Sequence, residues 1–390
     1  MRILSIETSC DETAIALLEV AGTKNPSGNI LAHTVASQIE LHAQYGGVFP
    51  MMAKREHAKN ILPVFEETLK KAGFLAAAKK PAEFSKSKIL KIKKILEREN
   101  ELGESFLNEI QKIKQPKIDK IVVTVGPGLT PALWVGISFA KALSLAWDIP
   151  IAPVNHMEGH LLSTLVKNPK EKFSLSSKDF QFPSISLLVS GGHTEIVLFK
   201  NIGTYKIIGR TRDDAAGEAF DKVARMLDLA YPGGPLISKL AAQYRNIHTD
   251  EKHIALPRPM MHSKDFDFSF SGLKTSVLYL LRDLGKIDDN KKMEIACEFE
   301  NAVVDVLTYK TFSAIEKYNA QSIIVGGGVS ANTELQKRFN IEAKKINIPV
   351  YFPEKNLSTD NAIMIAIAGY FAKPVSITSK KLVAVGNLEL

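Results

Sequence analysis

An apolar run that ends in a turn containing glycine occurs three times in this chain, and this pattern most limits the folds open to it. The turns are Gly126-Pro127-Gly128, Ser190-Gly191-Gly192 and Gly326-Gly327-Gly328, and each follows a run rich in valine, isoleucine or leucine. Short apolar runs bounded by glycine are typical of buried strands. Helical periodicity follows the first and third turns, over residues 131–147 and 331–345. Strands alternating with helices predict an α/β fold.

The order of the predicted elements suggests two halves of related design. Apolar runs at residues 2–6, 13–20 and 30–37 are separated by short polar turns, which predicts an antiparallel meander. A second strand, turn and strand follows over residues 182–189 and 194–199. We therefore expect a duplicated architecture of two lobes, each built around one sheet, with a central cleft between them.

A length of 390 residues also favours two lobes, because it exceeds the usual size of a single hydrophobic core. We expect an N-terminal lobe over residues 1–150 and a C-terminal lobe over residues 151–390. A lysine-rich helical insertion at residues 75–117 interrupts the first lobe. It holds ten lysines and Arg98 against six glutamates, so it supplies +5 of the formal charge of +8. This pattern predicts one or two exposed, charged helices.

Composition excludes several classes of protein. With 45% hydrophobic and 24% charged residues, the chain is neither disordered nor a disulfide-built miniprotein. Cys10 and Cys297 lie far apart and form no CxxC pair, which favours a reducing cytoplasm. The apolar stretch at residues 121–149 is interrupted by glycine, proline and Lys141, so we expect no membrane span. The first residues contain no apolar segment typical of a signal peptide.

Two histidines four residues apart, His156 and His160, suggest a metal site. At this spacing they share one helix face and can ligate one ion, although such a pair is as often structural. Glu158 does not directly follow the first histidine, as it does in the HExxH pattern, so a zinc protease is disfavoured. Asp360 at a predicted helix start is the candidate third ligand. Two histidines and one carboxylate suit iron(II) or catalytic zinc.

Three polar or glycine-rich turns are candidates for holding an anion. Residues 7–12 and 190–192 place hydroxyl and backbone N–H groups between strands, an arrangement that can hold phosphate oxygens. In the first turn, Asp11 or Glu12 can position a cation or a reacting amine, but taken alone the pattern favours a solvated hairpin. The glycines at 326–328 suit a nucleotide, and Asn332 can bind that ligand or cap the next helix. The spacing is not GxGxxG, which disfavours a Rossmann dinucleotide site.

Two further segments carry unusual patterns. The helix predicted over residues 213–229 has Gly217 and Asp221 on its polar face, and a glycine within a helix costs about 1 kcal/mol relative to alanine. We therefore expect something to approach closely at Gly217. Residues 266–274 alternate phenylalanine with small polar residues, which fits an aromatic face for a base or an edge strand packed on the core.

Taken together, these motifs resemble the tRNA adenosine threonylcarbamoyltransferase family (TsaD, formerly Gcp or O-sialoglycoprotein endopeptidase), closest to its bacterial members. The resemblance covers nearly the whole chain in the family's order, except for residues 75–117, which have no counterpart in the compact family pattern. The matching stretches are IETSCDETAIAL (6–17), HAQYGGVFPMMAKREH (42–57), GPGLTPALWVG (126–136), NHMEGHLLS (155–163), LLVSGGHTEIV (187–197), DDAAGEAFDKVARML (213–227), YPGGP (231–235), FSFSGLKT (268–275), GGGVSAN (326–332) and STDNAIMIA (358–366).

The resemblance implies an actin-like, sugar-kinase-like (ASKHA) fold with duplicated RNase H-like lobes. It also implies transfer of the threonylcarbamoyl group of threonylcarbamoyl-AMP to the exocyclic amine of the adenosine 3′ of the anticodon, in tRNAs that read codons beginning with A. His156, His160 and Asp360 match the family's ligands for one divalent ion, iron or zinc. Asp11 and Glu12 are our candidates for orienting the amine or a metal-bound water. The positions that match the adenylate-binding set are Leu188, Val189, Ser190, Gly191, Gly192, Asp221, Gly234 and Asn332.

The resemblance further implies tRNA, a degenerate paralogous TsaB-like subunit and a small P-loop ATPase of the TsaE type as partners. It places most of the metal and adenylate site in the C-terminal lobe. A metal-dependent peptidase, a small-molecule kinase of the same fold and a non-catalytic scaffold are the alternatives. The insertion at residues 75–117 is either an arm that contacts tRNA or a solvated helical hairpin.

Overall fold

The computed structural model describes residues 1–22, 26–78, 81–164, 166, 172–174, 181–248 and 254–390. The chain forms two compact units, described separately below. Unit 1 comprises Met1–Leu41, Val48–Ser177 and Asp360–Leu390, and unit 2 comprises His42–Gly47 and Lys178–Thr359. This division differs from the expected one at residue 150, because residues 151–177 and the last 31 residues, Asp360–Leu390, belong to the first unit.

Unit 1 is a sheet with helices on both faces. Its elements are β1 (Arg2–Glu7), β2 (Glu12–Ala21), β3 (Ser27–Ser37), α2 (Pro50–Lys71), α3 (Lys86–Ile95), α4 (Asn100–Ile110), β4 (Lys120–Gly126), α5 (Thr130–Trp147), β5 (Ile151–Asn155), α6 (His156–Ser163), β6 (Lys172–Ser174) and α12 (Ala362–Phe371). The short helix α1 (Ile39–Ala43) spans the boundary between the units.

Unit 2 contains the second sheet. Its elements are β7 (Ser184–Val189), β8 (Thr194–Asn201), β9 (Thr204–Arg210), α7 (Ala216–Met226), α8 (Gly233–Ile247), α9 (Ser271–Leu284), α10 (Asp289–Tyr318), β10 (Ser322–Gly326), η1 (Gly328–Ala331), α11 (Thr333–Lys345), β11 (Val350–Tyr351) and η2 (Lys355–Leu357). The 30-residue helix α10 was not anticipated from the sequence, because its apolar residues follow no single stripe.

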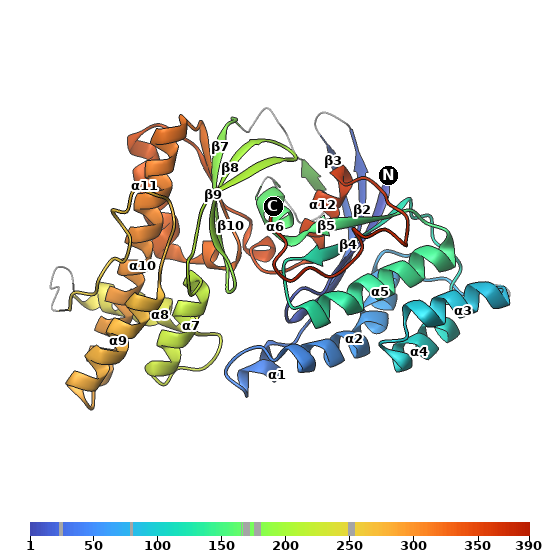
Figure 1. Ribbon diagram of the computed structural model, residues 1–390, viewed down its shortest axis with the longest axis horizontal. Helices are drawn as coiled ribbons and strands as arrows, with labels where there is room; N and C mark the ends of the chain where they lie inside the picture. Colours follow the sequence, from blue (N-terminus) through green and yellow to red (C-terminus); the bar gives the residue numbers. More distant parts are fainter. Residues whose placement is uncertain (23–25, 79–80, 165, 167–171, 175–180, 249–253) are drawn as a thin grey trace. The chain divides into compact units, whose positions relative to one another are not determined.

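The two sheets share one topology (Figure 1). In unit 1 the strand order is β5-β4-β1-β2-β3-β6, and in unit 2 it is β11-β10-β7-β8-β9. In each sheet the first strand pairs antiparallel with the second and parallel with the fourth. This repetition confirms the predicted duplicated α/β architecture of an actin-like, sugar-kinase-like fold. The cleft expected between the lobes stays a prediction.

Successive side chains of β1 point to opposite faces of the sheet in unit 1. Leu4 and Ile6 are fully buried in the hydrophobic cluster that includes residues of α2 and α5. Ser5 points to the opposite face, where its hydroxyl donates to the carbonyl of Ala362 at 2.6 Å. Helix α12 therefore lies on one face of this sheet, and α2 and α5 lie on the other (Figure 1).

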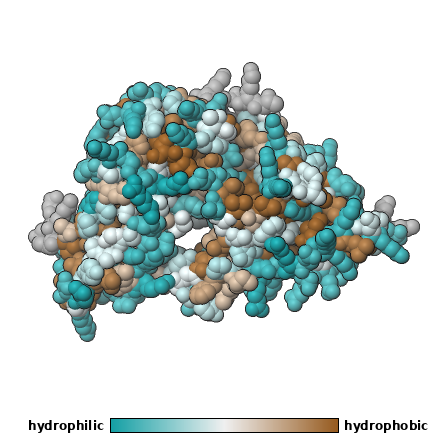
Figure 2. All heavy atoms as spheres, viewed as in Figure 1, coloured by the Kyte–Doolittle hydropathy of each residue, from teal (hydrophilic) through white to brown (hydrophobic). Residues whose placement is uncertain are grey.

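The segment expected to be an exposed insertion is part of the core of unit 1, so that prediction was wrong. Helix α4 buries Phe106 completely, and its ring packs edge-on against Phe139 of α5 at 5.5 Å. Ile92 of α3 and Ile110 of α4 are also fully buried. The sequence concealed this because lysines occupy five of the ten positions of α3. Figure 2 shows hydrophilic side chains gathered over the outer surface of α2 and α4.

Several boundaries differ from the predicted ones. Helix α7 begins at Ala216, three residues later than expected, because Asp213 and Asp214 belong to the preceding turn. Helix α12 begins at Ala362, where the side chain of Asn361 accepts a hydrogen bond from the backbone N–H of Met364. Among the described residues, no helix is both long and apolar enough to cross a membrane.

We expect Phe106→Ala to lower the free energy of unfolding of unit 1 by about 3–5 kcal/mol, because loss of a fully buried ring leaves a cavity. Both tryptophans of the chain, Trp134 and Trp147, lie on α5, so their fluorescence during urea unfolding reports on unit 1. Lys93→Ala on α3 is the control, with an expected change within about 0.5 kcal/mol. An unchanged unfolding midpoint for Phe106→Ala would show that α4 lies outside the core.

Candidate functional site

The turn between β1 and β2 is buried, so the solvated-hairpin interpretation is wrong. Thr8 is 1% exposed and Ser9 is 2% exposed. The hydroxyl of Thr8 donates to the carbonyl of Ala132 at 3.1 Å, and the carbonyl of Ser9 accepts from the N–H of Leu129 at 2.7 Å. The turn is therefore fixed against the start of α5.

His57 of α2 holds the other side of this turn. Its Nδ1 lies 2.7 Å from the hydroxyl of Thr13, and its Nε2 lies 2.9 Å from the carbonyl oxygen of Cys10. His57 is fully buried. His57 therefore anchors the segment that carries Asp11 and Glu12.

Helices α6 and α12 approach closely at Gly159, between the two histidines of α6. A Cβ atom at this position would lie 3.1 Å from side-chain atoms of both Met364 and Ile365. A larger residue at this position would require the side chains of Met364 and Ile365 to shift. This close approach brings Asp360, which lies just before α12, next to His156 and His160.

The three predicted metal ligands form one cluster within unit 1. One oxygen of Asp360, Oδ1, lies 3.3 Å from Nε2 of His156 and 3.1 Å from Nε2 of His160. The ligand atoms of the three residues all lie within 4.8 Å of one another. Metal bonds of about 2.0–2.1 Å at tetrahedral angles separate ligand atoms by roughly 3.3 Å. Donor types and separations therefore both fit a divalent ion.

Glu7 is a member of this cluster that the sequence reasoning did not single out. Its Oε2 lies 3.1 Å from Nδ1 of His156, on the side of the ring away from Asp360. Glu7 is the last residue of β1 and is fully buried. The available signal was a glutamate at the end of a largely apolar strand.

The charges in this cluster shift each other's proton affinities. Burial acts to lower the pKa of His156, but the carboxylates of Asp360 and Glu7 outweigh it and raise that pKa well above its usual range. Burial acts to raise the pKa of Asp360, yet His156 and His160 hold it well below its usual range. The metal-free site thus favours an imidazolium between two carboxylates, and a bound ion takes the place of its proton.

Asp11 and Glu12 lie at the end of the same turn. Asp11 is 8% exposed, and Glu12 is half-buried and accepts a hydrogen bond from the hydroxyl of Ser37 at 3.3 Å. Burial, together with the charges of Asp11 and Asp360, raises the pKa of Glu12 well above its usual range. This carboxyl group can therefore carry a proton near neutral pH.

In unit 2, the predicted Ser190-Gly191-Gly192 turn packs against the start of α7. A Cβ atom at Gly217 would lie 2.6 Å from the carbonyl oxygen of Ser190 and 2.8 Å from Cα of Gly191. The close approach expected at Gly217 is therefore made by the protein's own turn. Gly191 and Gly192 have no atom within 4 Å of a Cβ position, so the outer side of the turn is open.

Asp221 of α7 fixes the start of α8 in unit 2. Its Oδ1 accepts a hydrogen bond from the backbone N–H of Gly233 at 2.7 Å. Burial raises the pKa of Asp221, while the N–H groups of Gly233 and Gly234 act to lower it. The structure thus brings together two residues of the predicted adenylate set, Asp221 and Gly234.

The side chain of Asn332 is fully used within unit 2. Its Nδ2 donates to Glu300 at 2.6 Å and to Ser238 at 2.9 Å, and its Oδ1 accepts from the N–H of Leu335 at 2.8 Å. Asn332 is thus the cap of α11, one of the two roles that the sequence left open. A direct contact with a ligand through Nδ2 requires that one of its two bonds be exchanged.

The alternating phenylalanines at 266–270 belong to the core, which excludes the aromatic face for a base. Phe268 and Phe270 are fully buried, and Phe266 is 8% exposed. The segment forms no strand beyond a single bridge between Thr211 and Phe268. Asp213 fastens it by accepting hydrogen bonds from the hydroxyl groups at positions 269 and 271.

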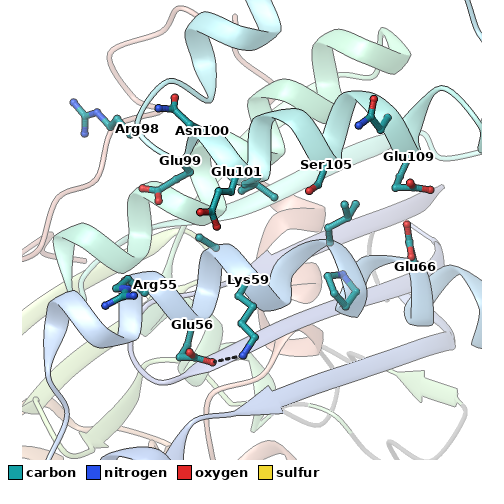
Figure 3. A pocket seen from close by; sticks show the side chains of 15 residues that line it. Arg55, Glu56, Lys59, Glu66, Arg98, Glu99, Asn100, Glu101, Ser105 and Glu109 are labelled. Carbon is teal, nitrogen blue, oxygen red and sulfur yellow. Dashed lines mark ion pairs between the residues drawn. The ribbon is translucent and has the colours of Figure 1, made fainter.

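A groove of about 930 Å³ lies between α2 and α4 in unit 1 (Figure 3). Five glutamates and three basic residues line it, so the groove carries an acidic excess. On its α2 side, Lys59 pairs with Glu56 at 3.9 Å. The charged lining residues are Arg55, Glu56, Lys59, Glu66, Arg98, Glu99, Glu101 and Glu109.

Comparison with known sequences gives a match along almost the entire chain. The sequence model of the family described as "TsaD: tRNA N6-adenosine threonylcarbamoyltransferase" matches residues 29–78 and 93–367. The gap between the matched ranges, 79–92, is narrower than the segment 75–117 that was expected to lack a counterpart. All of α4 and all of the predicted site residues except Asp11 and Glu12 lie in the matched ranges.

Two relatives named tRNA N6-adenosine threonylcarbamoyltransferase illustrate the similarity. The protein of Thermosipho africanus (strain TCF52B) is 42% identical over 392 residues and covers all of both chains. That of Chromobacterium violaceum is 40% identical over 382 residues, covering 96% of this chain and 95% of its own length.

Solved structures with a similar chain trace are distant in sequence. Component A of (R)-2-hydroxyglutaryl-CoA dehydratase from Acidaminococcus fermentans is 11% identical, with a TM-score of 0.48, covering 94% of this chain and 96% of its own. Full-length HypF in its phosphate- and nucleotide-bound form is 12% identical, with a TM-score of 0.49, covering 94% of this chain and 46% of its own.

We expect His160→Ala to abolish tight metal binding while leaving the fold intact, because only two of the three ligands remain. Metal content per chain, measured by elemental analysis after loading with Zn²⁺ or Fe²⁺, tests this outcome. His262→Ala, an exposed histidine in unit 2, is the control and should retain full metal content. Stoichiometric metal in His160→Ala would exclude this cluster as the metal site.

Proposed function

This chain belongs to the tRNA N6-adenosine threonylcarbamoyltransferase (TsaD) family, and we propose that it carries out the reaction for which the family is named. The threonylcarbamoyl group passes from threonylcarbamoyl-AMP to the exocyclic amine of the adenosine 3′ of the anticodon, in tRNAs that read codons beginning with A. The observation that carries the proposal is that a relative with this name aligns over the full chain. The His156–His160–Asp360 cluster of this chain supports it.

We assign His156, His160 and Asp360 as ligands of one divalent ion, iron or zinc. When bound, such an ion supplies a Lewis acid that polarises the carbamoyl carbonyl. The protein's own contribution is a pair of imidazoles and one carboxylate held by α6 and α12, in surroundings that exclude most water. Charge that develops during transfer is stabilised more strongly in such surroundings than in bulk water.

Asp11 and Glu12 are assigned to orienting the attacking amine. They lie at the end of the buried β1–β2 turn, which His57 and the start of α5 hold rigidly. A carboxylate at this position can accept a hydrogen bond from the amine, and a carboxyl with a raised pKa, as at Glu12, can donate one.

The adenylate is assigned to unit 2. Residues 188–192 end β7 in a turn whose outer side is open at Gly191 and Gly192, and backbone N–H groups in such a turn suit a phosphate. Gly328 is equally open, so the ligand has access to the end of β10. Asp221 and Gly234 complete the set at the start of α8. We assign Asn332 to this set as the residue that fixes the loop between β10 and α11.

We also propose the family's partners for this chain: tRNA as substrate, a degenerate paralogous TsaB-like subunit, and a TsaE-like P-loop ATPase, all in the cytoplasm. Family membership is what supports these partners. The peptidase alternative is disfavoured by the position of Glu158, and a small-molecule kinase leaves the cluster of two histidines and Asp360 without a purpose.

Metal-loaded protein, supplied with threonylcarbamoyl-AMP and unmodified tRNA, should form threonylcarbamoyladenosine, detected after nuclease digestion by mass spectrometry. Removal of the metal with a chelator should abolish the product, and Zn²⁺ or Fe²⁺ should restore it. One arm of the assay includes the TsaB-like and TsaE-like proteins. The proposal would be refuted if no arm gave modified tRNA and the protein instead cleaved peptides in a metal-dependent way or transferred phosphate from ATP to a small molecule.

The outer face of α3 gives a specific test of tRNA binding. Lys86, Lys91, Lys93 and Lys94 are exposed and form no ion pair among the described residues. The test measures the slope of log affinity for tRNA against log salt concentration. If these lysines contact phosphates, changing all four to Gln should reduce that slope. The expected reduction is about 0.7–0.9 for each phosphate that is no longer neutralised. The acidic groove between α2 and α4 repels phosphate, so tRNA is not expected to bind at that groove.

The control for this test changes four exposed lysines of unit 2, Lys200, Lys206, Lys337 and Lys344, to Gln. Both variants lose the same charge, so a general effect of net charge would alter both slopes equally. An equal slope for the α3 variant and the wild type would show that the lysines of α3 only solvate the helix.

A further inference from the structure

We infer that Glu7 is a positioning residue for the metal centre, accepting a hydrogen bond from Nδ1–H of His156 so that the lone pair of Nε2 points to the metal. The inference rests on the metal site assigned under the proposed function. It concerns a residue outside the three ligands and outside the Asp11–Glu12 pair.

The two nitrogens of His156 face different partners. Nδ1 lies 3.1 Å from Oε2 of Glu7, and Nε2 lies 3.3 Å from Oδ1 of Asp360. A neutral imidazole carries its proton on one nitrogen only, and the partner at that nitrogen decides which one. In the metal-loaded site Asp360 and Nε2 both face the ion, so the carboxylate at Nδ1 holds the one proton of the ring and leaves the lone pair of Nε2 free to ligate. Carboxylate–histidine–metal arrangements of this kind recur in metalloproteins.

Glu7 is itself held in place by other parts of unit 1. Its Oε1 accepts from the backbone N–H of Ser9 at 2.5 Å, and its Oε2 accepts from the hydroxyl of Thr124 at 2.5 Å. The side chain of Glu7 is 0% exposed. A carboxylate buried this completely is costly unless donors surround it, and here the β1–β2 turn, β4 and α6 each supply one.

The second histidine lacks such a partner. Nδ1 of His160 is buried and makes no hydrogen bond among the described residues. Of the two imidazoles, His156 alone is thus oriented by a carboxylate at its far nitrogen.

Ser9 offers a competing explanation, because its Oγ lies 3.2 Å from the same Nδ1. A serine hydroxyl is a neutral acceptor, and hydrogen bonds to an ionised acceptor are roughly twice as strong. Changing Glu7 should therefore affect the affinity for the metal more than changing Ser9.

The first test measures the affinity for Zn²⁺ by competition with a chromophoric chelator. Glu7→Gln keeps the size of the side chain but removes its charge, and we expect a roughly 10–100-fold weaker affinity. Ser9→Ala should weaken it much less. Glu298→Gln, a comparably buried ion-paired carboxylate of unit 2, is the matched control and should bind Zn²⁺ as the wild type does. Wild-type affinity in a folded Glu7→Gln protein would overturn the inference.

The second test needs no variant and so does not depend on the folding of Glu7→Gln. Long-range ¹H–¹⁵N spectra of the zinc-loaded wild type should show His156 protonated on Nδ1, with that proton shifted downfield by the carboxylate. Coordination through Nδ1, or an Nδ1 proton without the downfield shift, would overturn the inference. Neither test uses tRNA or threonylcarbamoyl-AMP, so a failure here is distinct from a failure of the proposed function.

Discussion

Close packing of α6 against α12 is the constraint on which the site of unit 1 depends. The two helices lie about 200 residues apart in the sequence, and Gly159 lets them approach closely enough to bring Asp360 to the histidines. The opposite end of α12 is also held, because the ammonium group of Lys120 donates to the carbonyl of Gly369 at 2.7 Å and to that of Ala372. A cation at this end is favourable for the helix dipole. Asp360 is therefore presented by a helix fixed at both termini.

Electrostatics then give the site its chemical character. A buried imidazole between two carboxylates holds a proton tightly until a divalent ion replaces it. The second carboxylate, Glu7, has no exposed surface, so its charge is tolerated only because three donors converge on it. The same low-dielectric surroundings raise the pKa of Glu12. Burial is thus the main cause of the pKa shift at Glu12, whereas at His156 and Asp360 it opposes the shifts and the neighbouring charges outweigh it.

In unit 2, the glycines fall into two groups that the sequence did not distinguish. Gly217 and Gly327 are required by the protein itself, since a Cβ atom would meet the carbonyl oxygen of Ser190 at 2.6 Å or that of Val189 at 2.4 Å. Gly191, Gly192 and Gly328 have open space around them and leave room for a ligand. A glycine permits close approach either of the protein's own backbone or of a ligand. Only the atoms around it in the structure show which of the two applies.

Local sequence patterns predicted most strands, most helices, the duplicated design and the metal-ligand candidates, because apolar periodicity, glycine turns and the His156–His160 spacing are local properties. Strands β5, β6 and β9 were not predicted. The sequence misjudged α3 and α4, whose lysines concealed a buried face that includes Phe106. It could not identify Glu7 as a partner of His156, nor show that Asn332 is already occupied by Glu300. Those contacts join residues 32 to 149 positions apart, and only the tertiary packing of strands and helices decided which side chains meet.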